Sequence, residues 1–423
     1  MQNGLITIAH LSDLHLGYRS GSKMTSHGVN WREMDGYMAF HRVVNQIIKD
    51  GTIDVVLIAG DVFHTPQPSI MTIYMAQKEI RRLSEAGMRV YILTGNHDVS
   101  DVKTEMAATA VLNDPDKNIW AHWEPYVRHE IAPGVLLHMV SHHLYQDQGK
   151  TWDVMRPEPG AINIFTAHGS IVDPITKLQL HTEGAPREIV IPDEIVEGRD
   201  WTARLLGHIH ERGFVGSKDG VHDTAGLKTY YNGSLIRRGF SDAEDALGRG
   251  WTKWTVMPDG TLIPEFHKIA QRPQVAFPVI DAEDMSASDV TDLVMDNLKS
   301  SITDDDDSDD EDASKRWSKA PILGQKIINI TPEKKRALDT KAINKEASKA
   351  LAWSFSMKSH QDTDNTSEKL GQPVAGGSLD EQFSNWLKDS DEYNRLHKSI
   401  KDKVADETMR FIKLSEDEVL DHE

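Results

Sequence analysis

Five short polar clusters carry most of the chemistry that this chain could perform, and each follows an apolar run typical of a β-strand. Their carboxylate, imidazole and amide groups are those that bind divalent cations in proteins. In chain order the clusters are Asp13-Leu14-His15, Gly60-Asp61, Gly95-Asn96-His97-Asp98, Ala167-His168-Gly169 and Gly207-His208-Ile209-His210. A mixed set of Asp, Asn and His suits Mn²⁺, Fe or Zn²⁺ better than Ca²⁺ or Mg²⁺. The pattern predicts a centre of two metal ions that cleaves phosphoester bonds.

Two of these residues can be given roles from their chemical type and position. Two ions that share a phosphate lie about 3.5–4 Å apart, and a carboxylate with two oxygens can bridge them. Asp61 is the candidate bridge, because it is the central aspartate and has no histidine immediately beside it. His97 follows the ligand-type residue Asn96 and is the candidate general acid that protonates the leaving oxygen.

Taken singly, each of these residues also has an ordinary structural explanation. Asp13 or Asp98 could cap a turn, and a lone buried histidine is more often a hydrogen-bonded core residue than a ligand. That explanation weakens when five histidines all follow strands and most lie in turns next to glycine, which permits tight backbone geometry. The remaining candidates lack that context, and we predict ordinary structural roles for His122, His129, His142, His143 and His181.

The elements that would position the clusters alternate between strand and helix patterns, as in an α/β domain. Nearly continuous apolar runs indicate strands that are buried on both faces. In such a sheet, functional groups gather beyond the carboxyl ends of the strands, where all five clusters would lie. We predict strands over residues 5–9, 53–59, 89–93, 162–165 and 203–206, and helices over 35–49 and 69–85.

The chain changes character after residue 270. Pro273 and Pro278 mark a connection between two parts of the chain. Residues 304–312 are almost entirely acidic and should be solvated and disordered. We predict a helix over 290–298, a strand–helix–strand unit over 325–330, 332–350 and 352–357, and further helices over 378–414. The expected domains are residues 1–270, 271–360 with a disordered insert near 300–320, a linker over 361–377, and a helical segment over 378–423.

Composition limits the protein class. The chain has 423 residues, 39% of them hydrophobic, and no cysteine, which excludes disulfides, thiolate zinc sites and cysteine nucleophiles. No apolar stretch approaches the roughly 20 residues that cross a bilayer, and no secretory signal is visible. These features predict an intracellular, cytoplasmic protein that is not bound to a membrane.

Net charge argues in part against a nucleic-acid substrate. The formal charge is −19, whereas phosphate backbones attract Lys and Arg. Part of that charge is concentrated in residues 304–312, however, and local basic groups remain at Arg237-Arg238 and at Lys334-Lys335-Arg336. The overall charge therefore lowers the expectation of nucleic-acid binding without excluding it.

The five clusters resemble the motifs of the calcineurin-like metallophosphoesterases: D-x-H, G-D, G-N-H-[DE], a separate H, and G-H-x-H, in the same order. Within that superfamily the chain is similar to the SbcD-type nuclease subunit of the double-strand-break repair complex. The local features that carry this narrower resemblance are residues 10–17 (HLSDLHLG), residues 60–64 (GDVFH) followed by Pro68-Ser69, and residues 231–234 (YNGS) followed by an acidic stretch at 242–245 and Gly250-Trp251.

The resemblance implies a four-layer α/β/β/α sandwich with a small α/β capping domain and C-terminal helices. It also implies that His97 contacts the scissile phosphate, that His64 orients the site or the substrate, and that the metal is manganese. One metal would be held by Asp13, His15, Asp61 and His210, and the other by Asp61, Asn96, His168 and His208.

Partners also follow from the resemblance alone. It implies a DNA substrate, a homodimer formed through helices near 35–50 and 68–86, and C-terminal helices that dock on an SMC-like coiled-coil ATPase of the SbcC type. The helices near 35–50 and 68–86 could instead merely pack on the sheet, and the C-terminal helices could equally fold back on this chain's own core. The acidic run at 304–312 is unexpected in a DNA-facing cap.

Three functions therefore remain open from the sequence. The first is a manganese-dependent DNA exonuclease or endonuclease that acts in DNA-end processing, repair and recombination with an ATPase partner. The second keeps the chemistry but acts as a phosphatase or phosphodiesterase on nucleotides or phosphoproteins. The third is a scaffold that has lost catalysis, which the presence of every ligand-type residue argues against.

Overall fold

The computed structural model describes residues 4–100, 106–142, 152, 155–172, 179–180, 189–198, 200–226, 228–240, 247–302 and 317–359. The chain divides into two compact units, and apart from Pro332 the elements below all belong to the unit of residues 1–328 and 333–357. The acidic run at 304–312, the linker at 361–377 and the terminal helices expected over 378–423 lie outside the described residues. The expected domain boundary near residue 270 stays a prediction.

The first sheet has six strands in the spatial order β14-β13-β1-β2-β3-β4. Its parallel part consists of β1 (Ile6–Leu11), β2 (Val55–Ala59), β3 (Arg89–Leu93) and β4 (Ile119–His122). β13 (Gly250–Val256) and β14 (Leu262–Lys268) extend it as antiparallel strands beside β1. Every parallel strand therefore delivers its carboxyl end to the same edge.

The second sheet also has six strands, in the order β11-β12-β10-β7-β6-β5. They are β5 (Tyr126–Ala132), β6 (Val135–Val140), β7 (Ile162–Ala167), β10 (Ala203–Leu206), β11 (Gly213–Phe214) and β12 (Thr229–Tyr231). β6, β7, β10 and β12 are parallel to one another. A separate short ribbon pairs β8 (Ile171–Val172) with β9 (Gln179–Leu180).

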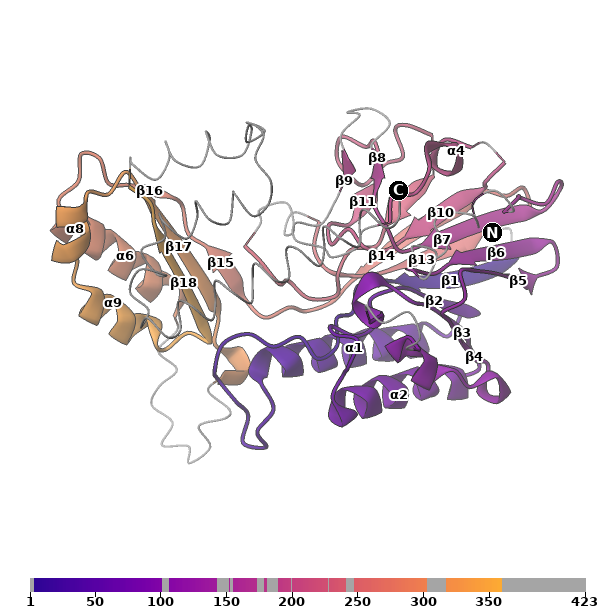
Figure 1. The fold of residues 1–423 in the computed structure, drawn as a ribbon, viewed down its shortest axis with the longest axis horizontal. Helices are drawn as coiled ribbons and strands as arrows, with labels where there is room; N and C mark the ends of the chain where they lie inside the picture. Colours follow the sequence, from indigo (N-terminus) through magenta and orange to yellow (C-terminus); the bar gives the residue numbers. More distant parts are fainter. Residues whose placement is uncertain are drawn as a thin grey trace, which may run out of the picture. The chain divides into compact units, whose positions relative to one another are not determined.

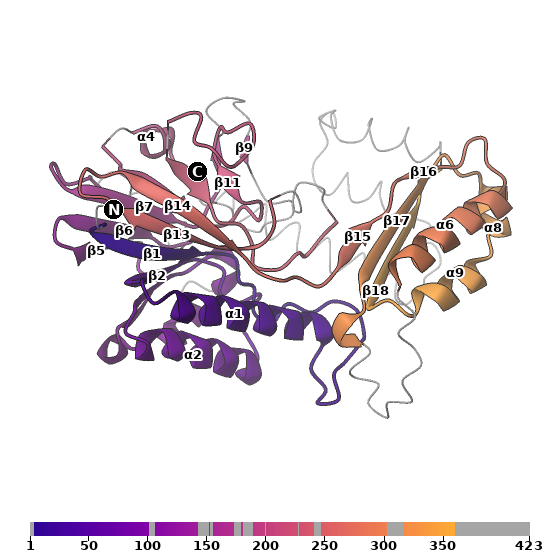
Figure 2. The same cartoon turned by 180° about the vertical axis from the view of Figure 1, so that it is seen from behind.

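Two helices cover the outer face of the first sheet, and the second sheet packs on its inner face (Figures 1 and 2). Apolar side chains of both sheets interdigitate between them, among them Ile8 and Leu57 from the first sheet and Leu137 and Ile164 from the second. In the described chain, the short helix α4 (Asp193–Val196) and loops cover the outer face of the second sheet. The expected α/β sandwich is confirmed, with a thin fourth layer.

The two long helices have clear termination signals. α1 (Trp31–Asp50) begins after Asn30, whose side chain accepts the N–H of Arg32, and ends at Gly51 in the left-handed conformation. α2 (Ile70–Glu85) begins after Ser69, whose hydroxyl accepts the N–H of Thr72. Both predicted helices are confirmed. Short 3₁₀ turns follow at η1 (Asn96–Asp98), η2 (Ala108–Leu112) and η3 (Pro115–Lys117).

A smaller parallel sheet follows residue 270. It contains β15 (Gln274–Ala276), β16 (Ile280–Asp281), β17 (Ile322–Ile328) and β18 (Ala352–Met357), with helices α6 (Ala287–Ser301), α8 (Pro332–Ala337) and α9 (Thr340–Ala347). The single helix predicted over 332–350 was wrong. The helix breaks at Leu338-Asp339, because Leu338 is buried and the Asp339 side chain caps α9 by accepting the N–H of Ala342.

None of the helices in the described part of the chain combines the length and the apolar character needed to cross a membrane.

Candidate metal centre

The five clusters lie at the carboxyl ends of strands from both sheets, where those ends meet. Asp13 and His15 follow β1, Asp61 follows β2, and Asn96 begins the 3₁₀ turn after β3. The second sheet contributes three imidazoles: His168 after β7, and His208 and His210 after β10. All seven side chains are buried, the most exposed being His210 at 7%. The structure thus brings together every predicted ligand.

Four of these residues have positive φ angles, which is uncommon for residues other than glycine. The values are 52° for Asp13, 43° for His15, 52° for Asp61 and 103° for His208. Backbone hydrogen bonds hold the first two loops in this conformation: the N–H of Asp13 donates to the Gly60 carbonyl at 3.1 Å, and that of His15 to the Asp61 carbonyl at 3.0 Å. Strain concentrated in this way is typical of functional sites.

One group of side chains surrounds the Nε2 atom of His15. That atom lies 3.1 Å from His210 Nε2 and 3.5 Å from Asp61 Oδ2. His210 Nε2 lies in turn 3.9 Å from Asp13 Oδ1. Two imidazoles and two carboxylates therefore face one small volume.

A second group lies on the other side of Asp61. His168 Nε2 is 3.3 Å from Asp61 Oδ2 and 3.1 Å from Asn96 Oδ1. The Asn96 oxygen is 3.2 Å from His208 Nδ1. Because Asp61 Oδ2 lies close to His15 Nε2 in the first group and to His168 Nε2 in the second, its carboxylate is common to both.

Hydrogen bonds from the surrounding backbone orient these side chains. The Nδ1 of His168 lies 2.8 Å from the Ala59 carbonyl, which can only accept, so this nitrogen keeps a proton and Nε2 is the ring nitrogen that can bind a cation. The His97 N–H donates to Asp61 Oδ1 at 2.9 Å, which leaves Oδ2 for the centre. The His208 N–H donates to both oxygens of Asp13, at 3.1 and 3.2 Å.

Three glycines make the close approach of the loops possible. A Cβ atom at Gly60 would collide with the His168 ring, and one at Gly95 would collide with the Asp61 carboxylate. A Cβ atom at Gly207 would meet the Ala59 carbonyl and His168. Any larger residue at these positions would push the ligand-type groups apart.

Burial and mutual attraction set the charges of the cluster. Burial raises the pKa of Asp13 to about 6 and lowers the pKa of His15 and of His210 well below the ordinary range. Burial also opposes charge on Asp61 and His168, but their mutual attraction prevails, lowering the pKa of Asp61 and raising that of His168. A cation that binds His168 Nε2 must therefore displace a proton from it.

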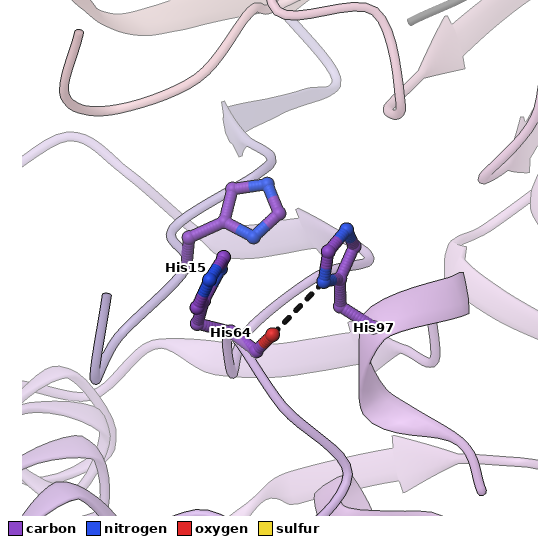
Figure 3. Close-up of side chains that lie close together, drawn as sticks. All are labelled: His15, His64 and His97. Atoms are coloured by element: carbon purple, nitrogen blue, oxygen red, sulfur yellow. Dashed lines mark hydrogen bonds between the residues drawn. The ribbon is translucent and has the colours of Figure 1, made fainter. Parts of the chain in front are cut away.

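His97 and His64 lie at the edge of this cluster, beside His15 (Figure 3). The His97 Nδ1 donates to the His64 carbonyl at 2.9 Å, so Nε2 is the ring nitrogen that remains for proton transfer. The rings of His64 and His97 stack, with centroids 5.3 Å apart, and the His97 ring meets that of His15 edge-on at 4.8 Å. Both predicted catalytic histidines are thus at the site.

Asp98, in contrast, has the structural role that the sequence allowed for it. Its carboxylate accepts the N–H of Gly95 at 2.9 Å, of Phe63 at 2.8 Å and of Val62 at 3.3 Å. These bonds tie the loop after β2 to the loop after β3, and so fix Asp61 relative to Asn96.

Sequence reasoning missed that two arginines contact His210, although it had named Arg238 as part of a local basic group. Arg249 donates to the His210 carbonyl and to Ser234 Oγ, the latter at 2.8 Å, and thereby supports the loop that carries His210. The Arg238 guanidinium lies against the His210 ring, with Nη2 2.9 Å from Nε2. The sequence offered one signal for these arginines, the motif at residues 231–234. It precedes Arg238, and it contains Ser234, which accepts a hydrogen bond from Arg249.

Comparison with known proteins identifies the family. The family model for calcineurin-like phosphoesterase matches residues 6–239, which contain all five clusters. This chain belongs to the calcineurin-like phosphoesterase family. The resemblance inferred from the motifs is confirmed, and with it the expectation, at family level, of a metal-dependent hydrolase of phosphoester bonds.

Among curated relatives of this calcineurin-like phosphoesterase are archaeal proteins named DNA double-strand break repair protein Mre11. The protein from Methanopyrus kandleri is 25% identical over 48% of this chain and 44% of its own length. Those from Saccharolobus solfataricus and Methanococcus maripaludis are 30% and 34% identical over 29% and 21% of this chain, and 31% and 22% of their own lengths. The chain thus matches less than half the length of these relatives.

A solved dimetal phosphatase from Danio rerio also aligns with this calcineurin-like phosphoesterase. It is 10% identical, the alignment covers 60% of this chain and 94% of that one, and the TM-score is 0.34. At that score the likeness carries no argument about fold or function.

Proposed function

We propose that the seven convergent side chains bind two divalent metal ions that share Asp61. The observation that supports this most strongly is the position of Asp61 Oδ2, 3.5 Å from His15 Nε2 and 3.3 Å from His168 Nε2. The proposed ligands are Asp13, His15, Asp61 and His210 for one ion, and Asp61, Asn96, His168 and His208 for the other.

The donor set fits such ions. It combines carboxylate and amide oxygens with imidazole nitrogens, and the bond of His168 Nδ1 to the Ala59 carbonyl leaves Nε2 as the nitrogen that would bind the ion once its proton is displaced. These donors suit Mn²⁺, Fe and Zn²⁺ alike, and manganese is the metal that we propose on the resemblance to the SbcD-type nucleases. When bound, two such ions polarise the phosphoester and activate water for attack.

His97 is the proposed general acid. Its Nδ1–H is fixed by the His64 carbonyl, so a second proton on Nε2 can pass to the leaving oxygen as the bond from phosphorus breaks. His64 acts as a positioning residue through this carbonyl and through the stacking of its ring on that of His97.

DNA is the proposed substrate, which makes the protein an exonuclease or endonuclease of DNA-end processing and repair. The name shared by the curated relatives supports this, as do the local features at residues 10–17, 60–69 and 231–251. Arg238, which contacts His210, and the basic groups on α8 give phosphate-binding chemistry despite the net charge of −19.

We further propose a homodimer and an SMC-like coiled-coil ATPase partner. Large apolar side chains are exposed on α2, where Ile70 is 87%, Met71 51% and Tyr74 57% exposed, and Met38 on α1 is 41% exposed. Such a patch on two neighbouring helices favours a helical seam between two copies. Light scattering would test the dimer, and co-purification from the native host would test the ATPase.

The nuclease is tested by offering the purified chain linear duplex and single-stranded DNA with Mn²⁺ or with excess chelator. Cyclic nucleotides, a chromogenic phosphodiester and a phosphopeptide complete the panel. We expect DNA cleavage that depends entirely on the metal. Cleavage of the small esters or the phosphopeptide with DNA left intact would favour the phosphatase alternative, which the acidic net charge supports. No cleavage of any ester by a folded, metal-free protein would favour the scaffold.

Replacing Gly60 by alanine should remove metal binding. Gly60 has a φ of +90°, and a Cβ there collides with the His168 ring. The backbone strain costs about 1–2 kcal/mol, and displacement of His168 takes one ligand from the centre. The measurement is Mn²⁺ binding by titration calorimetry, together with thermal unfolding.

Gly134→Ala is the matched control, because Gly134 has a φ of +73° but nothing within 4 Å of its Cβ position. It should lose a similar amount of stability and keep its Mn²⁺ affinity. Equal Mn²⁺ affinity in the two variants would show that the space at Gly60 is not needed for the centre.

A further inference from the structure

The guanidinium of Arg238 lies directly against the proposed centre. Its Nη2 is 2.9 Å from His210 Nε2 and 3.2 Å from His210 Nδ1, so the group lies along the imidazole between its two nitrogens. Its Nη1 is 3.4 Å from His64 Nδ1. One cationic side chain thus touches a proposed metal ligand and a histidine that positions the general acid.

The backbone that carries Arg238 is anchored to the loops of the centre. The Ser234 N–H donates to the His210 carbonyl at 3.0 Å, and the Leu235 N–H donates to the Asp13 carbonyl at 3.2 Å. The Tyr18 hydroxyl donates to the Arg238 carbonyl at 3.5 Å. The position of Arg238 is therefore determined by the same loops that present the ligands.

A permanent positive charge at this place opposes the binding of metal cations. A guanidinium keeps its charge throughout the accessible pH range, and here its Nη2 lies 2.9 Å from Nε2 of His210, a proposed ligand nitrogen. A neutral side chain would serve cation binding better. The charge makes sense if an anion joins the centre during the reaction, and a planar guanidinium matches the oxygens of a phosphate group.

We propose that Arg238 is a catalytic residue that binds a non-bridging oxygen of the scissile phosphate and stabilises the negative charge that grows there in the transition state. This inference rests on the proposed phosphoesterase function. Nothing in the motif clusters assigns this role, since Arg238 lies outside all five.

The proton balance of the step leaves Arg238 unchanged. A water oxygen bonds to phosphorus while the bond from phosphorus to the leaving oxygen breaks. His97 gives the leaving oxygen a proton, the water loses one to solvent, and His97 is later reprotonated from solvent. Arg238 keeps its protons throughout and contributes charge and two N–H donors.

The test compares Arg238→Gln and Arg238→Lys with Arg42→Gln. Arg42 is an exposed arginine of α1 that donates to the Ala270 carbonyl at 3.1 Å, so its replacement removes the same charge from a residue whose described hydrogen bond is not to a ligand of the centre. Three quantities are measured for each protein: affinity for Mn²⁺, affinity of the Mn²⁺-loaded protein for inorganic phosphate, and kcat and KM for a chromogenic phosphodiester.

We expect Arg238→Gln to bind Mn²⁺ at least as tightly as the parent, because a repulsive charge has gone. Its affinity for inorganic phosphate should fall by about 10-fold or more, as for the loss of a charge-assisted hydrogen bond. Its kcat should fall by about 10²–10³-fold, with a smaller change in KM. Arg238→Lys should recover part of both losses, and Arg42→Gln should match the parent.

Two results would overturn the inference. One is an Arg238→Gln protein with parental phosphate affinity and kcat. The other is loss of Mn²⁺ affinity together with a lower melting temperature, which would assign Arg238 a structural role beside His210. Failure of the proposed function is distinguishable, because a parent protein that cleaves no phosphoester would still report on phosphate and Mn²⁺ binding.

Discussion

Replacing Asp61 by asparagine should give a folded protein that no longer holds the pair of metal ions and no longer cleaves phosphoesters. Asp61 Oδ2 is the atom closest to both ligand groups, and the substitution removes the charge that attracts two cations at once. The amide oxygen can still accept the His97 N–H that Asp61 Oδ1 accepts, so the loop should keep its conformation. We expect kcat/KM to fall by at least about 10³-fold, which is more than the loss in rate that follows removal of a single hydrogen-bond donor from an active site.

The measurement combines metal content after dialysis, calorimetric titration with Mn²⁺, and a phosphodiester assay. Asp116→Asn is the control, because it makes the same change of charge at an exposed position in η3. An Asp61→Asn protein that binds two Mn²⁺ ions with parental affinity would exclude Asp61 as the shared ligand.

Replacing His97 by alanine should reduce cleavage of DNA by about 10²–10⁴-fold, the usual contribution of a general acid. The loss should be much smaller on a phosphodiester with a nitrophenolate leaving group, because that group departs without a proton. Proton donation is assigned to His97 Nε2, because the His64 carbonyl fixes the Nδ1–H of His97 and leaves only Nε2 for proton transfer. The measurement is kcat/KM on both substrates, together with Mn²⁺ affinity.

His27→Ala provides the control for His97→Ala, since His27 is exposed on a loop before α1. It should cleave both substrates at the parental rate. If His97→Ala reduced kcat/KM by the same factor on DNA and on the nitrophenyl ester, proton donation would be contradicted. The result would indicate that His97 only binds the phosphate.

The convergence of the ligands could be predicted because it follows from a general property of parallel strands. Asp13, Asp61 and Asn96 follow neighbouring strands of one sheet, and the carboxyl ends of such strands meet at one edge. His168 and His208 were predicted on the motif pattern, but nothing local indicates that β7 and β10 belong to a second sheet. That division depends on which apolar faces pack together, and periodicity does not specify the partner of a face.

Arg238 shows why contacts outside the five motif clusters could not be predicted from the sequence. Its contact with His210 joins two loops that lie far apart in the chain, and it depends on the bonds of Ser234 and Leu235 to the loops of the centre. The break between α8 and α9 differs, because its signal was local and visible. Asp339 followed by Thr340 is an acceptable helix start, and the prediction of one helix over 332–350 overlooked it.

The division of the ligands between two sheets has a consequence for how the protein is made. A nascent chain that has completed β4 already contains Asp13, His15, Asp61 and Asn96, but it has none of the three imidazoles that follow β7 and β10. An incomplete set holds a divalent ion weakly, and ion uptake is coupled to folding. Loading with the proposed ions should therefore be among the last events of maturation, and half-synthesised molecules would carry no reactive centre.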